Sequence, residues 1–430
     1  MSTIIGNVFY FLVLLSILVV AHELGHFLTA KLLGIGVEIF SIGFGPRILG
    51  FRRKGTDYRV SAVPIGGYVK LKGEETSTGA PDEYLSRPKG QRFLVLFMGP
   101  MMNLLVAVLV MTGVYMAGLE EPKYLSQPVV VGWVELGSAA DKAGIKPGDQ
   151  ILQIDDQKNP TWRDLRVIVS TRAGHPVKVK VKRGEQVFDT LLIPQKRTRY
   201  ELGYSGIYVP TQPVIGQLIP GQPAEKAGLK RGDRIIRVNG EEVKDFFHLR
   251  DIISASAGKE LTLTVKRGDK VFNVKITPVE REGRGIIGFF PYEETIKIKV
   301  SLPKAFYLSL KENLYYLKLT VDVIGRLITG KISARTLSGP LDIAQFSYMT
   351  ASAGAIPFLA FLAFVSLQLA VINLLPIPAL DGGHIFIILI EVLIGRDLSE
   401  RTKEWILRIG FYLIILLSVF VIVNDILKRI

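Results

Sequence analysis

Four long apolar runs alternate with polar segments along the 430-residue chain. The first run covers residues 4–21 without a formal charge, and its apolar pattern continues to Leu33. The other runs cover residues 93–119, 356–380 and 405–423. Each run is long enough to cross the hydrocarbon core of a bilayer as a helix. The pattern therefore predicts a multi-domain membrane protein with a four-span α-helical transmembrane core.

The polar segments between these runs predict the orientation in the membrane. The first run has neither a basic n-region nor a small-residue cleavage site, so we expect a retained helix rather than a signal peptide. The short loop 34–92 is rich in Lys and Arg, and such loops stay in the cytoplasm. The long segment 120–345 is a domain, and domains translocate largely regardless of charge. We therefore expect this segment and both chain termini to be extracytoplasmic.

The long segment contains an internal repeat. Residues 143–149 (AGIKPGD) recur as 227–233 (AGLKRGD), and residues 182–184 (KRG) recur as 266–268, both at an offset of 84 residues. Short runs of alternating apolar and polar residues fill each copy, together with one helix-like stretch. This pattern predicts two small, mainly β domains of roughly 80 residues each.

The second copy resembles the PDZ family through residues 227–240 (AGLKRGDRIIRVNG), and the first copy resembles it less closely. PDZ domains usually bind extended peptides or carboxyl termini. We assign residues 202–207 (LGYSGI) to the second copy as its glycine-rich carboxylate loop. The first copy then lacks a convincing loop of this kind, and we expect no peptide binding there.

Residues 301–339 follow the repeats and carry apolar side chains mostly three and four positions apart, with charged residues between them. This spacing predicts an amphipathic helix that lies on the membrane surface. A helix packed on the tandem domains is the alternative, because the pattern alone does not say what the apolar face contacts.

The amino-acid composition indicates the class of protein and excludes some kinds of site and partner. The chain is 48% hydrophobic and 21% charged, with a mean hydropathy of +0.32, which is typical of a membrane protein with a sizeable aqueous part. It contains no cysteine, so disulfides, thiol nucleophiles and cysteine-based metal sites are excluded. The net charge of +14 is expected to reflect cytoplasmic loops and lipid headgroups, with no nucleic acid as a partner.

The strongest chemical motif lies near the end of the first run. Residues 22–26 read His-Glu-Leu-Gly-His, and on a helix His22 and His26 lie on one face about one turn apart. Both imidazoles can therefore reach one zinc ion, and Glu23 can reach a water molecule on that ion as the general base. A chance match is disfavoured, because unpaired polar groups in an apolar membrane segment are costly.

Two histidines leave a catalytic zinc ion one protein ligand short. Asp381 is the best candidate, because it follows a helix broken by Pro376 and Pro378 and would be costly at membrane depth without a partner. His384 is the rival ligand, although an interfacial or supporting role suits it better. Both alternatives remain open at this point.

Taken together, the chain resembles the site-2 protease family of intramembrane zinc proteases over essentially its whole length. The resemblance rests on the His-Glu-Leu-Gly-His motif, on residues 373–382 (NLLPIPALDG) and on the tandem PDZ-like domains between them. It implies one Zn²⁺ per chain, bound by His22, His26 and Asp381, with Glu23 as the general base.

The resemblance also implies residues that bind the substrate. Asn373 would hold the substrate backbone, and Pro376 and Pro378 would shape the loop around it. The segment Gly43-Phe44-Gly45 matches the glycine turn of a membrane-associated β segment in this family, and residues 58–71 would complete that sheet. An exposed sheet edge could pair with a substrate helix that has unwound into a strand.

The implied activity is cleavage of single-span membrane proteins near the cytoplasmic side of a bacterial inner membrane. Implied substrates are a membrane-bound anti-sigma factor already trimmed by another protease, and remnant signal peptides. The PDZ-like domains would either bind peptide tails or exclude substrates with large external domains. The predicted domains are the first helix (1–34), a cytoplasmic β segment and loop (35–91), the second helix (92–119), the PDZ-like domains (120–197 and 198–281), an amphipathic region (282–345), the third span (346–394) and the fourth (395–430).

Two other functions compete with this interpretation. A transporter could use His22, Glu23 and Asp381 as an ion path, but four spans without an inverted repeat are poorly suited to alternating access. A membrane scaffold could present the PDZ-like domains and use the metal only structurally. Under that hypothesis a Glu23→Gln substitution would leave function intact.

Overall fold

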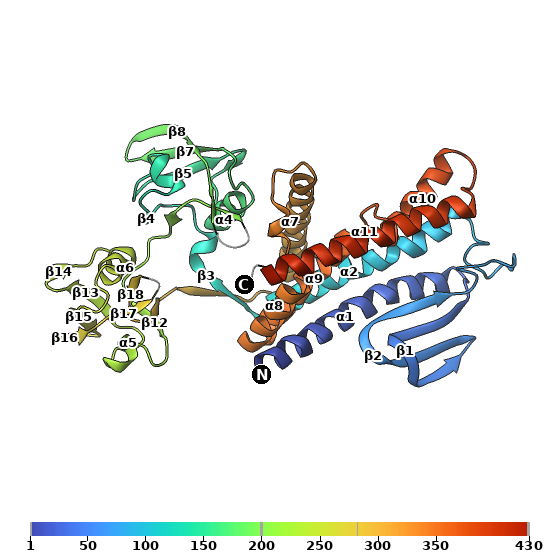
Figure 1. Ribbon diagram of the computed structural model, residues 1–430, viewed down its shortest axis with the longest axis horizontal. Helices are drawn as coiled ribbons and strands as arrows, with labels where there is room; N and C mark the ends of the chain where they lie inside the picture. Colours follow the sequence, from blue (N-terminus) through green and yellow to red (C-terminus); the bar gives the residue numbers. More distant parts are fainter. Residues whose placement is uncertain (1, 198–200, 282, 428–430) are drawn as a thin grey trace. The chain divides into compact units, whose positions relative to one another are not determined.

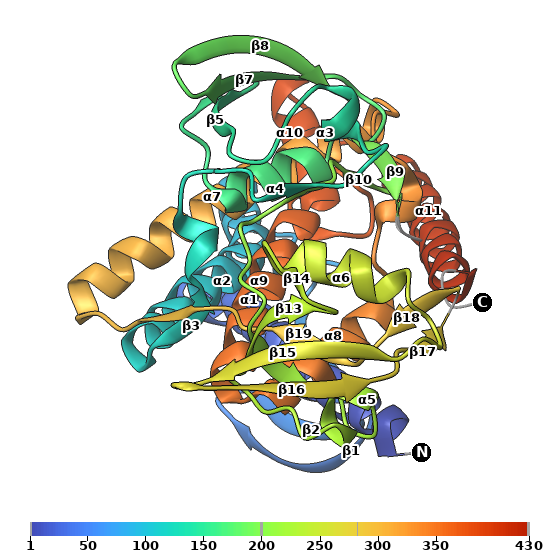
Figure 2. The same ribbon diagram turned by 90° about the vertical axis from the view of Figure 1, so that its left-hand side faces the viewer.

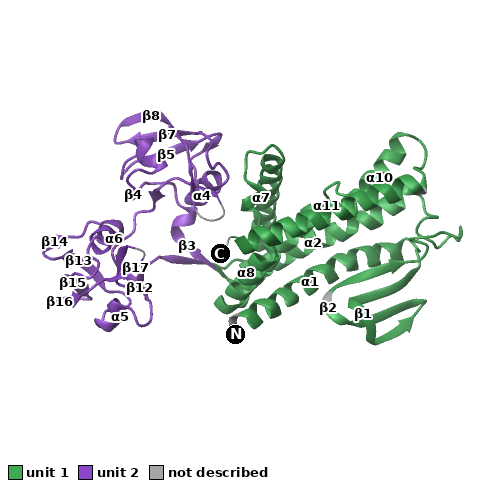
Figure 3. Cartoon of the chain, viewed as in Figure 1, with its two compact units in different colours: residues 1–119, 298–430 green, residues 120–297 purple. Residues whose placement is uncertain are grey.

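The computed structural model describes residues 2–197, 201–281 and 283–427. The chain forms two compact units, shown in Figure 3. Unit 1 comprises residues 1–119 and 298–430, and unit 2 comprises residues 120–297. The first boundary, 119/120, coincides with the predicted start of the long segment, whereas the second, 297/298, falls well before its predicted end at residue 345.

Unit 1 is built around helices. Within the described ranges, four of them are long and apolar enough to cross a membrane, and they overlap the four apolar runs of the sequence, although the third helix ends at Asn373, before the end of its run. Figure 1 shows the N-terminus and the C-terminus at the same end of this helical layer. The helices of unit 1 are α1 (Ser2–Leu32), α2 (Lys89–Ala117), α7 (Leu302–Ile328), α8 (Pro340–Ala353), α9 (Ala355–Asn373), α10 (Asp381–Leu393) and α11 (Glu400–Leu427), with a short 3-10 turn at Ala334–Thr336.

Helix α2 lies between α1 and α9 and contacts both. One apolar cluster joins Leu14 and Leu18 of α1 to Leu362 of α9, with Val106 of α2 packed against it. The hydroxyl of Ser366 donates to the Asn103 carbonyl at 2.7 Å, which ties α9 to α2 across the bundle. These contacts hold together the segments that bear the sequence motifs.

The region after the repeats differs from the prediction. Residues 301–339 are not one helix, because α7 ends at Ile328, Gly330 takes a φ of +68°, and Pro340 begins α8. The predicted boundary at 345/346 falls inside α8. The buried face of α7 contacts α2 and α9 of the same unit, and Ser309 donates to the Val108 carbonyl at 2.7 Å.

Strands β1 (Val37–Arg53) and β2 (Thr56–Leu71) form an antiparallel ribbon that lies against α1 (Figure 1). The ribbon is curled, because Phe40 of β1 has two partners in β2, Tyr58 and Val69. The first half of β1 therefore lies between the two halves of β2. The expected sheet is present, although Gly43–Gly45 is a bend within β1 rather than a turn between strands.

Unit 2 contains two segments with the same order of elements, named here repeat 1 and repeat 2. Repeat 1 contains β4 (Trp133–Val134), α3 (Ala139–Lys142), β5 (Gln150–Ile154), β6 (Gln157–Lys158), α4 (Trp162–Ser170), β7 (Val177–Arg183), β8 (Gln186–Leu192), β9 (Gln195–Arg197), β10 (Leu202–Tyr204) and β11 (Ile207–Tyr208). Repeat 2 contains β12 (Ile215–Leu218), α5 (Pro223–Lys226), β13 (Arg234–Val238), β14 (Glu241–Glu242), α6 (Phe246–Ser254), β15 (Leu261–Arg267), β16 (Lys270–Ile276), β17 (Val279–Arg281), β18 (Arg284–Ile286) and β19 (Phe289–Pro291). The 3-10 turn Lys123–Ser126 precedes repeat 1, and β3 (Leu119–Pro122) pairs with β20 (Thr295–Ile298) where the chain enters and leaves the unit.

The central sheets of the repeats match strand for strand. Their orders are β6-β5-β7-β8 and β14-β13-β15-β16, and one helix packs beside each sheet, α4 in repeat 1 and α6 in repeat 2 (Figure 2). Buried side chains from the sheet and from this helix form a separate core in each repeat. Each repeat therefore has its own core and its own sheet.

The predicted boundary between the copies is wrong. Residues 198–200 lie outside the described part of the chain, but β9 before them pairs with β10 after them, and β11 pairs back with β4. Residues 202–207 therefore belong to repeat 1, and the equivalent segment of repeat 2 begins at Arg284. The predicted end of the second copy at residue 281 is too early for the same reason, since β17 pairs with β18.

Each repeat has an ion pair with a buried carboxylate at the same place, Asp149 with Arg183 and Asp233 with Arg267, each at 2.7 Å. Burial opposes the ionisation of Asp149, but hydrogen bonds from Arg183 and from the Lys146 amide outweigh it and hold the pKa of Asp149 below its usual value. The ionised carboxylate therefore stabilises the fold above the unfolded pKa of about 3.9, and this contribution is lost as pH falls through the folded pKa.

We expect Asp149→Asn to lower the stability of repeat 1 by about 1.5–3 kcal/mol at neutral pH, because the buried charged hydrogen bonds are lost. Hydrogen exchange of the full chain should show faster exchange in β5 and β7. The variant should also lose the acid sensitivity of repeat 1 below about pH 4. Repeat 2 retains Asp233 and serves as the internal control. Equal exchange in wild type and variant would contradict the prediction.

Candidate metal centre

Two helices bring the predicted ligands together in unit 1. Helix α1 places His22 and His26 on one face, and Asp381 is the first residue of α10. The His22 Nε2 atom lies 3.1 Å from His26 Nε2 and 3.0 Å from Asp381 Oδ2, and His26 Nε2 lies 3.5 Å from Asp381 Oδ1. One ligand atom from each of the three residues lies within 4.8 Å of the others.

The donor set fits a zinc ion. His26 Nδ1 lies 2.8 Å from the Val95 carbonyl, which can only accept a hydrogen bond, so Nδ1 carries the proton. In the neutral ring, the lone pair of His26 Nε2 then points toward His22 and the carboxylate of Asp381. A cation relieves this crowding of lone pairs, and ligands about 2.0–2.2 Å from one tetrahedral zinc ion lie roughly 3.3–3.6 Å apart. The observed separations of the three ligand atoms are close to that range.

The second nitrogen of His22 contacts two amide side chains. Asn103 Nδ2 lies 3.5 Å from His22 Nδ1, and Asn373 Nδ2 lies 3.4 Å from the same atom. A ligating Nε2 leaves the proton on Nδ1, so one of these amides must present its oxygen. Asn103 is fully buried and its Oδ1 has no partner among the described residues, so turning its amide would give this oxygen a donor in His22 Nδ1–H.

Glu23 is held by the β ribbon. Its Oε2 accepts a hydrogen bond from the Val69 amide of β2 at 2.9 Å. Val69 pairs with Phe40 of β1 on one side of β2, and because its amide points to Glu23, the opposite edge of β2 faces Glu23 instead of β1. The carboxylate next to the three clustered residues is therefore fixed by backbone from a distant part of the sequence.

Helix α2 crosses α1 closely at two glycines, Gly99 of α2 and Gly25 of α1. A Cβ atom on Gly99 would lie 2.3 Å from His26 Nε2, and one on Gly25 would lie 2.2 Å from the Met98 carbonyl. These distances are far below any normal contact, so both positions require glycine. The close crossing of α1 and α2 lets the Val95 carbonyl and the Asn103 amide reach the two histidines.

The loop between α9 and α10 is packed tightly and contains Pro376 and Pro378. Added Cβ atoms on Gly382 and Gly383 would collide with the backbone of residues 374–378. A Cβ on Gly410 of α11 would likewise lie 2.2 Å from Pro378 Cβ. The packing holds Asp381 at the start of α10 and Asn373 at the end of α9, beside His22.

The segment Gly43-Phe44-Gly45 lies in the β ribbon. The Phe44 ring stacks on Tyr68 at 5.7 Å, and Gly43 and Gly45 have φ angles of +88° and +90°. A Cβ added at Gly66 would lie 3.2 Å from the side chain of Val19 of α1, one turn before the histidine motif. The ribbon therefore lies beside α1 at the level of the candidate centre.

His384 is not part of the cluster among the described residues. It lines a cavity with Leu407 and Phe411 of α11 instead. The sequence interpretation also missed Asn103, Gly99 and the Val69 amide. Asn103 had a usable signal, since it is a lone amide in an apolar run, whereas nothing local marks a backbone amide as a partner of Glu23.

Comparison with known proteins gives a consistent result. The model of peptidase family M50 matches residues 10–417. The chain belongs to peptidase family M50. It is 32% identical to the regulator of sigma E protease of Salmonella typhi, covering 99% of both chains, and 31% identical to the regulator of sigma-E protease RseP of Escherichia coli K12, covering 96% of this chain and 97% of the relative.

A further relative from Pasteurella multocida carries the name of a zinc metalloprotease and is 31% identical, covering 97% of this chain and 98% of the relative. This M50 chain is thus a membrane-embedded zinc protease, as the sequence motifs predict. Its similarity to regulators of sigma E supports a role in regulated intramembrane proteolysis.

In this M50 protease, Asn103→Leu should weaken zinc binding about 10–100-fold, since loss of an outer-shell partner of a metal-ligating histidine has this effect. The variant keeps the side-chain volume but cannot accept from His22 Nδ1. Competition of purified protein with a zinc chelator measures the change. Asn103→Asp is the matched control, because its carboxylate can accept the same proton. Unchanged affinity in Asn103→Leu would contradict the role.

Proposed function

We propose that His22, His26 and Asp381 bind the zinc ion of this protease and that Glu23 is its general base. The observation that supports this most is the approach of the three ligand atoms, contributed by two apolar helices, to within 4.8 Å of one another. Bound there, zinc would polarise the scissile carbonyl and lower the pKa of a water molecule.

The residues of the chain supply the remaining steps. Glu23 takes the proton of the attacking water and returns it to the leaving amide nitrogen. The Val69 amide keeps the carboxylate in place for both transfers. Asn103 orients His22, which leaves the partly exposed Asn373 to hold the substrate backbone. Pro376 and Pro378 give the loop between α9 and α10 the shape that presents Asn373.

The substrate in this proposal is the spanning segment of a single-span membrane protein. Its helix hides the scissile carbonyls in internal hydrogen bonds, so it must unwind and be paired again as a strand. The edge of β2 at Val69 faces Glu23 and is free of β1, so a strand added there would pass the centre. The bend at Gly43-Phe44-Gly45 shapes the ribbon that presents this edge.

We further propose a location in a bacterial inner membrane, with the active site near the cytoplasmic side. The basic loop 34–92 and the position of both termini at the other end of the helical layer support this orientation (Figure 1). Repeats 1 and 2 are PDZ-like domains on the extracytoplasmic side in this arrangement. They would limit access to substrates already trimmed outside, such as an anti-sigma factor or remnant signal peptides.

The test is cleavage of a tagged single-span reporter by detergent-purified full chain, with bound zinc counted in the same samples. We expect one zinc per wild-type chain and reporter cleavage. Asp381→Asn should lose most of its zinc and its activity, because a neutral amide is a poor ligand. Asp397→Asn, a surface substitution near the end of α10, is the matched control. Full zinc and activity in Asp381→Asn would overturn the assignment.

A further inference from the structure

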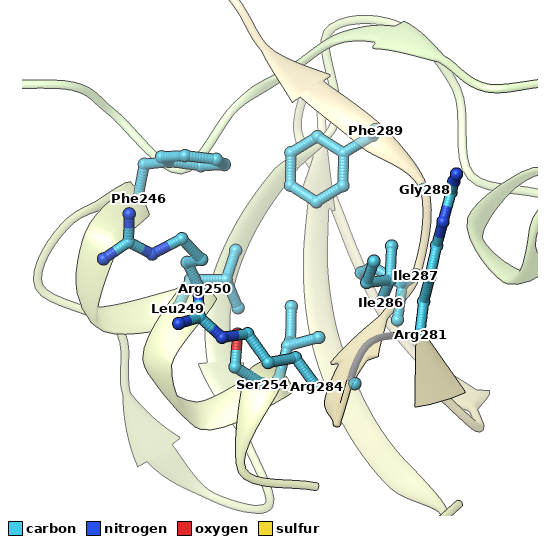
Figure 4. A pocket seen from close by; sticks show the side chains of 12 residues that line it. Phe246, Leu249, Arg250, Ser254, Arg281, Arg284, Ile286, Ile287, Gly288 and Phe289 are labelled. Carbon is cyan, nitrogen blue, oxygen red and sulfur yellow. The ribbon is translucent and has the colours of Figure 1, made fainter. Parts of the chain in front are cut away.

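Repeat 2 contains a groove of ≈ 610 Å³ between α6 and the segment from β17 to β19 (Figure 4). Its apolar floor includes Leu249 and Ile253 of α6 and Ile287 of the facing segment. Phe246 and Phe289 lie at one end of the groove. The groove belongs to repeat 2 alone and shares no residue with the metal centre.

Three arginines line this apolar groove. In Figure 4 the side chains of Arg250 and Arg284 lie at the side of α6, and that of Arg281 lies across from them. Arg250 is already engaged, because its guanidinium pairs with Asp251 Oδ1 at 3.2 Å and lies 4.7 Å from the ring of Trp133 in repeat 1. Among the residues that the structure describes, neither Arg281 nor Arg284 has an ion pair, and no carboxylate lines the groove.

In repeat 1 the equivalent arginine is paired with a carboxylate of the same repeat. Arg197 pairs with Leu202 in the β9–β10 hairpin as Arg281 pairs with Arg284 in the β17–β18 hairpin. The guanidinium of Arg197 donates to Glu135 Oε2 at 2.7 Å. Burial opposes the ionisation of Glu135, but Arg197 and Tyr204 outweigh it and lower the pKa of Glu135. Repeat 1 therefore neutralises its own arginine.

The carboxylate of Glu135 has no equivalent in repeat 2. The Glu135 amide donates to the Gly206 carbonyl, and the Ile219 amide donates to the Gly288 carbonyl at the same point of the fold. Ile219 therefore occupies the place of Glu135. Arg284 also stands where repeat 1 has Leu202, so repeat 2 has lost one internal carboxylate and gained one arginine.

We propose that the groove of repeat 2 binds an extended peptide through acidic side chains of that peptide. The apolar floor suits an extended backbone with some apolar side chains, and the free guanidiniums supply charge-assisted hydrogen bonds to carboxylates. Arg281 and Arg284, which have no ion pair among the described residues, together carry more charge than a single terminal carboxylate neutralises, which favours acidic side chains over a free carboxyl terminus. The inference goes beyond protease activity and makes repeat 2 the selective one of the two repeats.

The experiment measures binding of a fluorescent peptide of roughly ten residues, with three aspartates and an amidated end, to the detergent-purified full chain. We expect saturable binding that weakens roughly tenfold or more when the aspartates become asparagines. Affinity should also fall between about 50 and about 300 mM NaCl. A free carboxyl terminus should add little. Equal binding of the asparagine peptide, or binding that requires the free terminus, would overturn the proposal.

Exchanging the two repeats' residues gives matched variants. Ile219→Glu should abolish binding, because the new carboxylate would pair with Arg281 as Glu135 pairs with Arg197. The double variant Arg281→Gln, Arg284→Gln alters only exposed side chains and keeps the test valid if Ile219→Glu fails to fold.

Binding unchanged in both the Ile219→Glu and the double variant would overturn the proposal. Displacement of the peptide by anionic phospholipid vesicles with the same dependence on the arginines would do so as well, since it would make the groove a lipid site. None of these readouts depends on turnover or on bound zinc, so this proposal and the assignment of the metal centre fail separately.

Discussion

Replacing Glu23 by Gln should lower reporter cleavage by about 10²–10⁴-fold while zinc stays bound, because the amide cannot accept a proton from water. Glu23 is adjacent to His22 in sequence but is not in the cluster of ligand atoms. Its carboxylate is held by the Val69 amide, and an amide oxygen can accept the same hydrogen bond. Local structure should therefore survive the substitution.

Single-turnover cleavage with bound zinc counted in parallel separates the effects of Glu23→Gln. Loss of cleavage with one zinc retained is the expected pattern for a general base. Loss of zinc together with activity would instead make Glu23 a ligand. Cleavage at the wild-type rate would contradict the protease mechanism and favour a structural metal.

Adding one methyl group at Gly99 should disrupt the metal centre almost as completely. In Gly99→Ala the new Cβ would lie 2.3 Å from His26 Nε2 and 2.9 Å from His22 Cε1. The obstructing atoms belong to the rings of the two histidines that bind zinc in the proposed site, and the nearest, His26 Nε2, is itself a ligand atom, so relief of the clash must move a ligand. We expect zinc affinity to fall by at least about 10–100-fold and cleavage to fall with it.

Gly113→Ala is the matched control on the same helix, because its added Cβ meets nothing within 4 Å. That variant should keep zinc and activity and gain slightly in helix stability. Zinc titration and reporter cleavage of both variants decide the matter. Full zinc affinity in Gly99→Ala would show that α1 and α2 are farther apart than the structure has them.

Much of unit 1 could be predicted from the sequence because its signals are local. An apolar run of about 20 residues can be satisfied in a bilayer only as a helix, so the four long helices follow from composition. The histidine spacing in α1 is likewise a property of one helix. The boundaries of α7 and α8 were predicted less well, since the partner of an amphipathic face depends on which helices lie nearby.

In the repeats, too, local patterns were predictable from the sequence, whereas contacts between segments were not. The offset of 84 residues revealed two copies, and the ion pairs Asp149–Arg183 and Asp233–Arg267 occupy equivalent places in both. Residues 202–207 were nevertheless assigned to the wrong copy, because strand pairing joins β10 to β9 across the predicted boundary. Pairing between strands is a contact between segments, and no single segment encodes it.

The sequence alone determined the four long apolar helices, the tandem repeats, the absence of thiol chemistry and the candidacy of His22, Glu23, His26 and Asp381. These depend on hydropathy, periodicity and residue type. The tertiary structure decided which groups surround them: Val95 and Asn103 behind the histidines, Val69 on Glu23, and Gly99 against His26. Backbone carbonyls, amides and missing side chains have no signature of their own in a sequence. They acquire a role only where packing brings α1, α2 and β2 within hydrogen-bonding distance.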